Sequence, residues 1–560
     1  MIFTNISSNL TGGSFFLVMF PMRNKRCYAG EALHPSSGMK GFSKRRFIAP
    51  FVQEPNRYEF RFKLGESEID NDISGKRRII SMKTGKEYIE SLRTMEPVVY
   101  AFGEKVKDLP DHPCFRPTIN ALALTYDLAK ERSDLLAAES PFTGARINRF
   151  LHIFKSPDDL VKRAQLGNFL TPRHGACVGA RCAGTGALNA LFATTYEMDG
   201  KLGTDYHKRF LRFLERVQRD DLACSGMVTD AKGNRSLSPG KQSDPDVYLH
   251  AIEEKNGGIV VRGAKAHQSG AAIAHENIVV PTTTMGPEEK KFAVAFAIPP
   301  DAPGMVHIAE APASNARRFN GDKRDFGNYN YGVHGSTLVV FNDVFIPRER
   351  VFMCGEQEFT GLLVQRFAAC QRLATAACKS GHCNLVCGAA AVAAEYNGCG
   401  KIGHIRDKIT EMFFQSTLAF GTAIAAGYTA TRTPSGVYMP DTLMVNAAKL
   451  QAVKAVWDAS QLACDIAGGV VCTAPAGKDF DNPEIAGYVD KYFKGKADVS
   501  TEDRIRIVRL VEYLIGQSSI VPTESVHGAG PSAAQRLMIR ASGNLDYLKR
   551  CARIMAGIET

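Results

Sequence analysis

One uninterrupted stretch, residues 360–396, constrains the fold more than any other part of the sequence. It reads TGLLVQRFAACQRLATAACKSGHCNLVCGAAAVAAEY and contains no proline. Its small and apolar residues can form one helix of about 35 residues, roughly 50 Å long. A helix of that length needs partners along its whole length, so the sequence predicts a helical bundle in the C-terminal part of the chain.

Apolar periodicity divides the rest of the chain into helical and strand regions. Helical spacing occurs over residues 85–106, 119–131 and 157–170. Between about 225 and 350 the pattern changes to short β-branched and aromatic runs bounded by Gly and Pro, which are typical of strands: 257–267, 275–285, 290–300 and 336–347. The sequence therefore predicts an α+β protein with a β domain between two helical ones. Clefts between such domains are common ligand sites.

The charge distribution argues against nucleic acid as the main partner. The net charge is +11, but residues 1–53 hold seven Lys or Arg against one acid, Glu31. The remaining 507 residues therefore carry little excess charge and lack the basic stripe of a nucleic-acid-binding surface. The mild positive excess suits anionic ligands such as nucleotide cofactors or acyl-CoA. No segment approaches the length of a transmembrane helix, so no membrane partner is expected.

Residues 1–80 differ from the rest and are predicted to be an N-terminal extension. Their apolar run FFLVMF is too short for a membrane span, and basic residues follow it, which is the reverse of a secretory signal. One interpretation is a mitochondrial transit peptide, which would place the protein in the mitochondrial matrix. The alternative is a disordered extension or a wrong start site, with a cytoplasmic protein.

Several polar segments are candidates for ligand binding. The segment 228–237, VTDAKGNRSL, can clamp an anion or be a plain surface loop. The segment 262–270, RGAKAHQSG, ends a predicted strand and can contact a ligand or form a solvated loop. The segment 523–536, TESVHGAGPSAAQR, has glycines that allow close backbone approach to a ligand or cap a helix. The polar candidates in these segments are Thr229, Asp230, Arg235, Lys265, His267, Gln268, Ser269, Glu524 and His527.

The fourteen cysteines predict reduced thiols of an intracellular enzyme, not a disulfide framework. Cys177 and Cys182, together with Cys378, would supply three thiolates suited to an iron–sulfur cluster. The alternative is that they are small buried hydrophobic residues. At about 100° per residue, the four cysteines of 360–396 cannot converge on one ion from a straight helix. Cys383 and Cys387 are therefore predicted to be packing residues.

Five segments together resemble the 4-hydroxybutyryl-CoA dehydratases, a branch of the 4-hydroxyphenylacetate 3-monooxygenase (HpaB-type) flavoprotein family. They are EYIESLRTMEPVVYAFGEKV, TTYEMDGKLGTDYHKRF, GIVVRGAKAHQSGA, VVFNDVFIPRERVF and ESVHGAGPSAAQR. The resemblance runs from about residue 81 to the C-terminus. It implies an acyl-CoA-dehydrogenase-like fold with an N-terminal helical domain (81–224), a middle antiparallel β domain (225–350) and a C-terminal four-helix bundle (351–560) that forms homotetramers.

The resemblance also implies cofactors and chemistry. FAD would lie between the β domain and the bundle, and a [4Fe–4S] cluster would be held by three Cys and one His. Such enzymes remove an unactivated β-hydrogen from an acyl-CoA substrate through a transient flavin radical, with the cluster as Lewis acid. The flavin contacts implied here are Thr229, Asp230, Arg235, Lys265, His267, Gln268, Ser269, Gly468 and Gly469.

The match is mixed when residues are carried over one at a time. Cys182 and Cys378 match cluster ligands, whereas Cys177 is one residue farther from Cys182 than the family spacing. Gln371 stands where the family has its His ligand, which leaves Gln371 or the adjacent Cys370 as the fourth ligand. Thr375 replaces a family Tyr, and Ser336 stands near a family Glu. Glu524 and Lys379 match catalytic positions, and Ser269 conservatively replaces a family Thr near the flavin, where it is also a catalytic candidate.

Three functions remain open on the sequence. The first is an FAD-dependent 4-hydroxyacyl-CoA dehydratase or vinylacetyl-CoA isomerase with the cluster. The second is a flavin-only acyl-CoA oxidoreductase or aromatic monooxygenase of the same fold, because Gln is a poor ligand for cluster iron. The third is an inactive paralogue, because proton-handling groups are lost.

Overall fold

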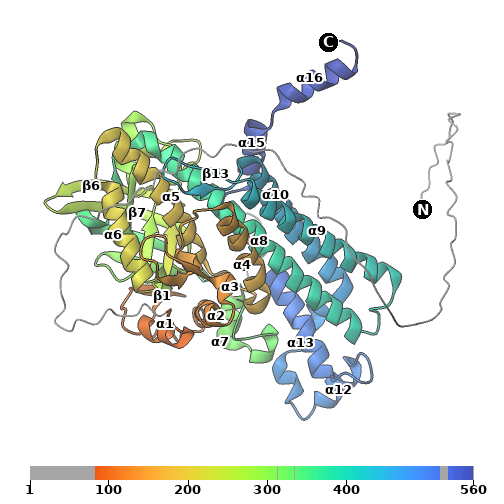
Figure 1. Ribbon diagram of the computed structural model, residues 1–560. Helices are drawn as coiled ribbons and strands as arrows, with labels where there is room; N and C mark the ends of the chain where they lie inside the picture. Colours follow the sequence, from red (N-terminus) through yellow and green to blue (C-terminus); the bar gives the residue numbers. More distant parts are fainter. Residues whose placement is uncertain (1–81, 312, 333–334, 518–527, 559–560) are drawn as a thin grey trace, which may run out of the picture. The chain divides into compact units, whose positions relative to one another are not determined.

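The computed structural model describes residues 82–560, apart from 312, 333–334, 518–527 and 559–560 (Figure 1). The chain divides into two units, Met1–Lys76 and Arg77–Thr560, and the described residues belong to the second. The extension predicted over residues 1–80, with its targeting role, lies outside the described residues. Within the described ranges, no helix has the length and apolar character needed to cross a membrane.

The first part of the described chain is mainly helical. Helix α4 begins with a capping box between Ser156 and Asp159 and ends at Gly175, whose left-handed backbone (φ 54°) turns the chain into α5. The structure confirms the helices predicted over 119–131 and 157–170. The helices of this part are α1 (Gly85–Leu92), α2 (Arg116–Glu131), α3 (Ser133–Leu136), α4 (Pro157–His174), α5 (Gly179–Leu202) and α6 (Tyr206–Arg219).

The single helix predicted over 85–106 is wrong. Helix α1 ends at Leu92, and the chain continues as two short strands, β1 (Val99–Ala101) and β2 (Glu104–Lys105). Pro97 lies between helix and strand and cannot donate a backbone hydrogen bond. Phe102 and Gly103 both have positive φ, 52° and 84°, which closes a tight hairpin. Local turn chemistry thus overrode the apolar periodicity.

Two sheets form the β region. The larger sheet has the strand order β2-β1-β10-β11-β7-β6, and the smaller one has the order β12-β9-β8-β5. Most pairs are antiparallel, but β1 with β10 and β5 with β8 are parallel, so the sheets are mixed rather than purely antiparallel. The strands of these sheets not yet given are β5 (Cys224–Met227), β6 (His250–Lys255), β7 (Gly258–Ser269), β8 (Glu276–Val279), β9 (Val294–Ile298), β10 (Met305–Ala309), β11 (Ser336–Pro347) and β12 (Val351–Cys354).

The strand runs predicted from the sequence are confirmed, and β11 occupies the whole run 336–347. Strands β7 and β11 pair along their full lengths, from Ser336 opposite Ser269 to Pro347 opposite Gly258. This pairing fixes where β7 ends, and that end borders the cavity described below. Two smaller antiparallel pairs are β3 (Ala137–Glu139) with β4 (Arg146–Asn148) and β13 (Thr431–Arg432) with β14 (Tyr438–Met439).

The C-terminal part is a helical bundle built around α8 (Figure 1). Helix α8 spans Thr360–Tyr396, which confirms the predicted long helix. It packs against α4 and α5 from the N-terminal part and against α9 (Gly403–Tyr428), α10 (Thr442–Ala467) and α13 (Thr501–Glu512). The shorter helices are α7 (Ala313–Asn320), α11 (Val470–Thr473), α12 (Ala486–Tyr492), α15 (Ser532–Ser542) and α16 (Leu545–Met555).

Helix α8 takes part in two separate cores. Its first half, including Leu363, Phe367 and Leu373, joins the core shared with the sheets. Its second half, including Cys383 and Cys387, joins a core formed with α9, α10 and α13. The prediction that Cys383 and Cys387 are packing residues is therefore confirmed. The long helix connects the β region to the bundle, and the candidate site lies along its first half.

Candidate active site

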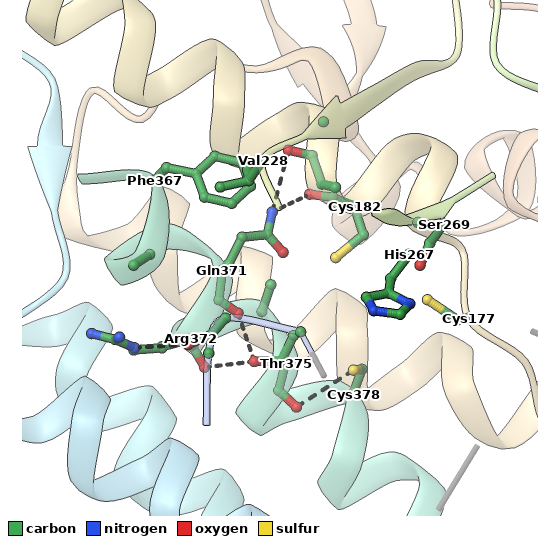
Figure 2. Close-up of a pocket in the computed structure, with 18 of the residues that line it drawn as sticks. Cys177, Cys182, Val228, His267, Ser269, Phe367, Gln371, Arg372, Thr375 and Cys378 are labelled. Atoms are coloured by element: carbon green, nitrogen blue, oxygen red, sulfur yellow. Dashed lines mark hydrogen bonds between the residues drawn. The ribbon is translucent and has the colours of Figure 1, made fainter. Parts of the chain in front are cut away.

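One large cavity lies where α4, α5, the end of β7 and α8 meet (Figure 2). Its volume is about 950 Å³, at the upper end of the range of small-molecule and cofactor sites. The segment 528–534, which leads into α15, forms part of its wall. The cavity therefore brings together segments that are far apart in the chain, from Phe150 to Ala534, and most of the predicted site residues border it.

The three predicted metal-ligand cysteines border this one cavity. Cys177 and Cys182 come from the turn before α5 and from its first turn, and Cys378 comes from the middle of α8 (Figure 2). Helix α5 can approach the end of β7 closely because Gly179 has no side chain: a Cβ there would lie 2.3 Å from Ser269 Cβ. The thiols of two distant segments are thus held at the same cavity as the strand end.

Cys182 is accompanied by a buried cation. The Arg163 guanidinium, on α4, donates a hydrogen bond from Nη2 to Cys182 Sγ at 2.9 Å. Arg163 is only 2% exposed and lies over the Phe150 ring, with 5.1 Å between the guanidinium carbon and the ring centroid. A fixed guanidinium complements negative charge on sulfur, whether as a thiolate or as a metal ligand.

Gln371 borders the cavity, but its amide is already engaged. Its Nε2 donates to the carbonyl oxygens of Cys182 (3.0 Å) and Ala183 (3.3 Å) in α5. One turn along α8, the Thr375 hydroxyl donates to the Gln371 carbonyl oxygen at 2.7 Å, and Cys378 Sγ donates to the Thr375 carbonyl oxygen at 3.4 Å. The α8 wall of the cavity is therefore a ladder of polar groups bonded to helix backbone.

Cys370, the other candidate for a fourth ligand, faces away from the cavity. Its thiol is buried in the core shared with the sheets and contacts Met439, with 3.7 Å between the two sulfur atoms. Burial raises the pKa of this thiol to about 12. The structure thus brings Gln371, and not Cys370, to the cavity wall.

The end of β7 supplies a second polar wall. Thr229, Arg235, His267, Gln268 and Ser269 all border the cavity. Gln268 Nε2 donates to the Thr229 carbonyl oxygen at 3.0 Å, and the Ser269 and Ser336 hydroxyl oxygens are 3.2 Å apart. These bonds tie the strand end to the 228–237 loop and to the start of β11, and they hold its side chains in fixed positions.

Asp230 and Lys265 lie behind this wall and not on it. They form a buried ion pair with 2.9 Å between Lys265 Nζ and Asp230 Oδ1. Lys265 Nζ also donates to the carbonyl oxygens of Val228 and Val280, at 2.9 and 3.0 Å. Burial lowers the pKa of Lys265 and raises that of Asp230. The pair fastens the 228–230 segment to β7 and so positions its neighbour Thr229.

Cations line the remaining wall. Lys232, Arg235 and Arg372 border the cavity, and burial lowers the pKa values of Lys232 and Arg372. Arg372 Nε donates to the Ala529 carbonyl oxygen at 3.2 Å, and among the described residues no carboxylate forms an ion pair with it. Arg372 is buried, Lys232 is half-buried and Arg235 is exposed. Three cations at one cavity favour an anionic ligand such as a phosphate. Lys379, also on the wall, is 1% exposed.

Two predicted flavin contacts lie away from the cavity, and two further candidates cannot be placed. Gly468 and Gly469 lie at the exposed C-terminal end of α10 and do not border the cavity. Glu524 lies outside the described residues, as does His527.

Sequence reasoning missed Arg163, Glu310 and Arg372, which also border the cavity. Arg163 had a signal, because it interrupts the buried stripe of α4 between Leu160 and Gly167. Glu310 follows β10 and approaches His267 only through the sheet, so nothing local in the sequence marks it.

Comparisons with known proteins identify the family. A model described as 4-hydroxyphenylacetate 3-hydroxylase N terminal matches residues 84–353, and one described as the C terminal matches residues 360–557. The chain therefore belongs to the 4-hydroxyphenylacetate 3-hydroxylase (HpaB) family. This confirms the resemblance seen in the sequence.

Within that family, the chain is similar to dehydratases. It is 40% identical over 491 residues to 4-hydroxybutyryl-CoA dehydratase/vinylacetyl-CoA-Δ-isomerase of Clostridium aminobutyricum, covering 85% of this chain and all of the relative. An oxygen-tolerant archaeal 4-hydroxybutyryl-CoA dehydratase from N. maritimus superposes with a TM-score of 0.84 at 41% identity, over 86% of this chain and 96% of that chain.

A more distant structure shares the fold. It is the oxygenase component of 4-hydroxyphenylacetate 3-monooxygenase in complex with FAD, with a TM-score of 0.72 at 24% identity. It covers 84% of this chain and 98% of that chain. The mixed helix-and-sheet architecture predicted from the sequence is thus that of known enzymes.

Proposed function

We propose that the chain is a flavin-dependent lyase or isomerase that acts on a 4-hydroxyacyl-CoA or a vinylacetyl-CoA. The observation that carries the proposal is the meeting of Cys177, Cys182 and Cys378 at one cavity beside the end of β7. The 40% identity extends over the whole length of a dehydratase/isomerase. An acyl-CoA-dehydrogenase-like layout, with the cavity between β region and bundle, accompanies this proposal.

The cavity suits a flavin nucleotide. Its volume of about 950 Å³ accommodates a large planar cofactor together with part of a substrate. Thr229, Gln268 and Ser269 would hold the ring system, and Lys232 and Arg235 would face the phosphates. Asp230 and Lys265 would act from behind, by holding the Thr229 segment against β7.

The donor set also suits an iron–sulfur cluster through its three cysteines. No group of three or more Cys, His, Asp or Glu within the described residues is close enough to hold a single metal ion. A cluster differs, because each iron takes one protein ligand and the ligands stand farther apart. When bound, flavin would supply redox equivalents for breaking a C–H bond, and the cluster would supply a Lewis acid for the leaving hydroxyl.

The chain's own catalytic groups are proposed to be Lys379, Ser269 and Glu524. Lys379 borders the cavity from a buried position, where an ammonium group can orient an anionic oxygen or transfer a proton. The Ser269 hydroxyl is held by Ser336 at the strand end and can donate a hydrogen bond to the flavin ring. Glu524 is proposed as an acid–base group on the resemblance alone.

A homotetramer is the proposed assembly. Exposed apolar side chains on α9 and α10 support it: Phe413 is 61% exposed, Phe414 51% and Trp457 49%. Unpaired apolar faces of this kind are typical of subunit interfaces. Sedimentation velocity should give four chains per particle, and a monomeric enzyme with full flavin content would contradict the assembly.

Anaerobically prepared protein tests the function directly. We expect bound FAD, about four irons per chain, and conversion of both 4-hydroxybutyryl-CoA and vinylacetyl-CoA to crotonyl-CoA. The matched control is the Lys379→Met variant, which should keep its flavin and lose turnover. Active protein without iron would exclude cluster-dependent dehydration.

A flavin-only enzyme is the second candidate, and the α8 wall favours it. The Gln371 amide is bonded to α5, and the Thr375 hydroxyl is bonded to its own helix. Such a protein would be iron-free and yellow, and reduced FAD with oxygen would support hydroxylation of a phenol. Absence of that hydroxylation, together with iron in the purified protein, would exclude this candidate.

A further inference from the structure

His267 has a backbone conformation that its sequence position does not explain. Its φ is 58°, in the left-handed region that non-glycine residues rarely occupy. Such a conformation costs roughly 1–2 kcal/mol and persists only where the surrounding structure enforces it, which is often at a functional site.

A β-bulge produces this conformation. Lys265 lies opposite Val339 and Gln268 opposite Thr337, so Ala266 and His267 on β7 face the single residue Leu338 on β11. A bulge of this kind turns a side chain out of the regular alternation of a strand. Here it directs the His267 ring into the cavity, where 61% of the side chain is exposed (Figure 2).

A carboxylate sets the orientation of the ring. His267 Nδ1 lies 3.2 Å from Glu310 Oε1, and Glu310 directly follows β10 in the same sheet. Histidines that bind metals commonly make such a bond through one ring nitrogen, which fixes the tautomer and points the other nitrogen at the metal. The contact between His267 Nδ1 and Glu310 has this form.

The three cysteines border the same cavity as this ring. In the view of Figure 2 the imidazole lies between the sulfur atoms of Cys177, Cys182 and Cys378, all of which border the same cavity. Gln371 cannot supply a nitrogen ligand, because an amide nitrogen has no available lone pair and its Nε2 is bonded to α5. Among the described residues that border the cavity, His267 is the one histidine.

We propose that His267, oriented by Glu310, is the nitrogen ligand of an iron–sulfur cluster whose other three ligands are Cys177, Cys182 and Cys378. The inference rests on the proposed cluster-dependent function and names a ligand for it. Imidazole is a good ligand for cluster iron, as the His-ligated [2Fe–2S] centres demonstrate. Gln371 then has a structural role, as the link between α8 and α5.

Pulsed EPR of the reduced cluster tests the assignment, with iron and sulfide content as a second readout. The protein is reconstituted anaerobically with Fe²⁺ and sulfide. Wild type should contain about four irons per chain and show strong ¹⁴N coupling from a ligating imidazole. His267→Asn keeps a residue that tolerates the left-handed backbone, and it should lose the ¹⁴N coupling and bind iron at least tenfold more weakly.

Three further variants separate ligation from folding. His267→Cys should restore four irons without the nitrogen coupling. Glu310→Gln should weaken iron binding about 10-fold and keep the coupling. His404→Asn, at an exposed position on α9, should match wild type. Circular dichroism, unchanged in all variants, shows that the fold is intact.

The outcomes also separate this proposal from the proposed function. Nitrogen coupling that persists in His267→Asn, or that disappears in Gln371→Ala, overturns the ligand assignment. If wild type still dehydrates 4-hydroxybutyryl-CoA in that case, the function stands. Wild-type protein that binds no iron after reconstitution overturns both.

Discussion

The two halves of α8 use cysteine in opposite ways. In the first half Cys378 borders the cavity beside Thr375 and Lys379. In the second half Cys383 and Cys387 are buried against α9, α10 and α13, and Cys387 Sγ donates to the Ile409 carbonyl oxygen at 3.7 Å. The residue type is the same in both halves. The elements that face each cysteine decide whether it is a site residue or a packing residue. A cysteine on this helix is a site residue only where α5 and β7 leave a cavity.

The largest expected effect comes from replacing one cysteine in each of these environments by alanine. Cys378→Ala should reduce turnover of 4-hydroxybutyryl-CoA about 100-fold or more, because removing a ligand costs at least as much as removing its supporting shell. Its free energy of unfolding should change little without the cofactor. Cys383→Ala should keep most of the turnover and lose about 1 kcal/mol of stability, because it leaves a small cavity.

Turnover and urea denaturation of the two variants measure this difference. Equal losses of turnover would show that the second half of α8 also serves the chemistry. A Cys378→Ala enzyme with normal turnover would remove Cys378 from the site.

The sequence predicted those parts of the fold that depend on local pattern. The helix over 360–396 and the strand over 336–347 were found because periodicity and breakers agreed there. The helix over 85–106 was wrong because the hairpin at Phe102 and Gly103 competes with apolar spacing. The site was harder, because its geometry depends on tertiary packing.

Three residues show how tertiary packing, which the sequence pattern does not contain, decides the geometry of the site. Cys370 and Gln371 are adjacent in sequence, yet one faces the core and the other the cavity. Helical spacing alone placed Cys370 about 80° from Cys378, but only the position of α5 decides which face is the cavity wall. Glu310 meets His267 through sheet pairing, which the sequence does not encode locally.

A second prediction tests the contact between Gln371 and α5. Gly186, on α5, faces Gln371: a Cβ there would lie 2.5 Å from Gln371 Nε2. Gly186→Ala should therefore displace the amide and cost about 1–2 kcal/mol of unfolding free energy. Gly388, on the exposed side of the second half of α8, has no atom within 4 Å of the added Cβ. Gly388→Ala should stabilise the protein by about 0.5–1 kcal/mol.

Urea denaturation of both variants measures these opposite changes in the free energy of unfolding. If Gly186→Ala is as stabilising as Gly388→Ala, then Gln371 is not held against α5, and its amide becomes available to the cavity.

The last prediction concerns Cys370, which lies in the first half of α8 but on the face away from the cavity, and its effect is confined to alkaline pH. Burial raises the pKa of its thiol from an ordinary value near 9 to about 12. The folded state therefore keeps this thiol neutral at pH values where the unfolded chain ionises it. Its contribution to stability is complete below pH 9 and is lost as the pH rises toward 12, at up to about 1.4 kcal/mol per pH unit.

Two variants separate the effect of the Cys370 thiol from that of other groups that titrate in the same pH range. Cys370→Ala should flatten the decline of unfolding free energy above pH 9, whereas Cys472→Ala, at an exposed position, should leave the slope unchanged. Iodoacetamide at pH 8 should label exposed Cys472 in the native protein and Cys370 only after unfolding. Rapid native labelling of Cys370 would mean that its face of α8 opens to solvent, and the division of the helix into a cavity face and a core face would then fail.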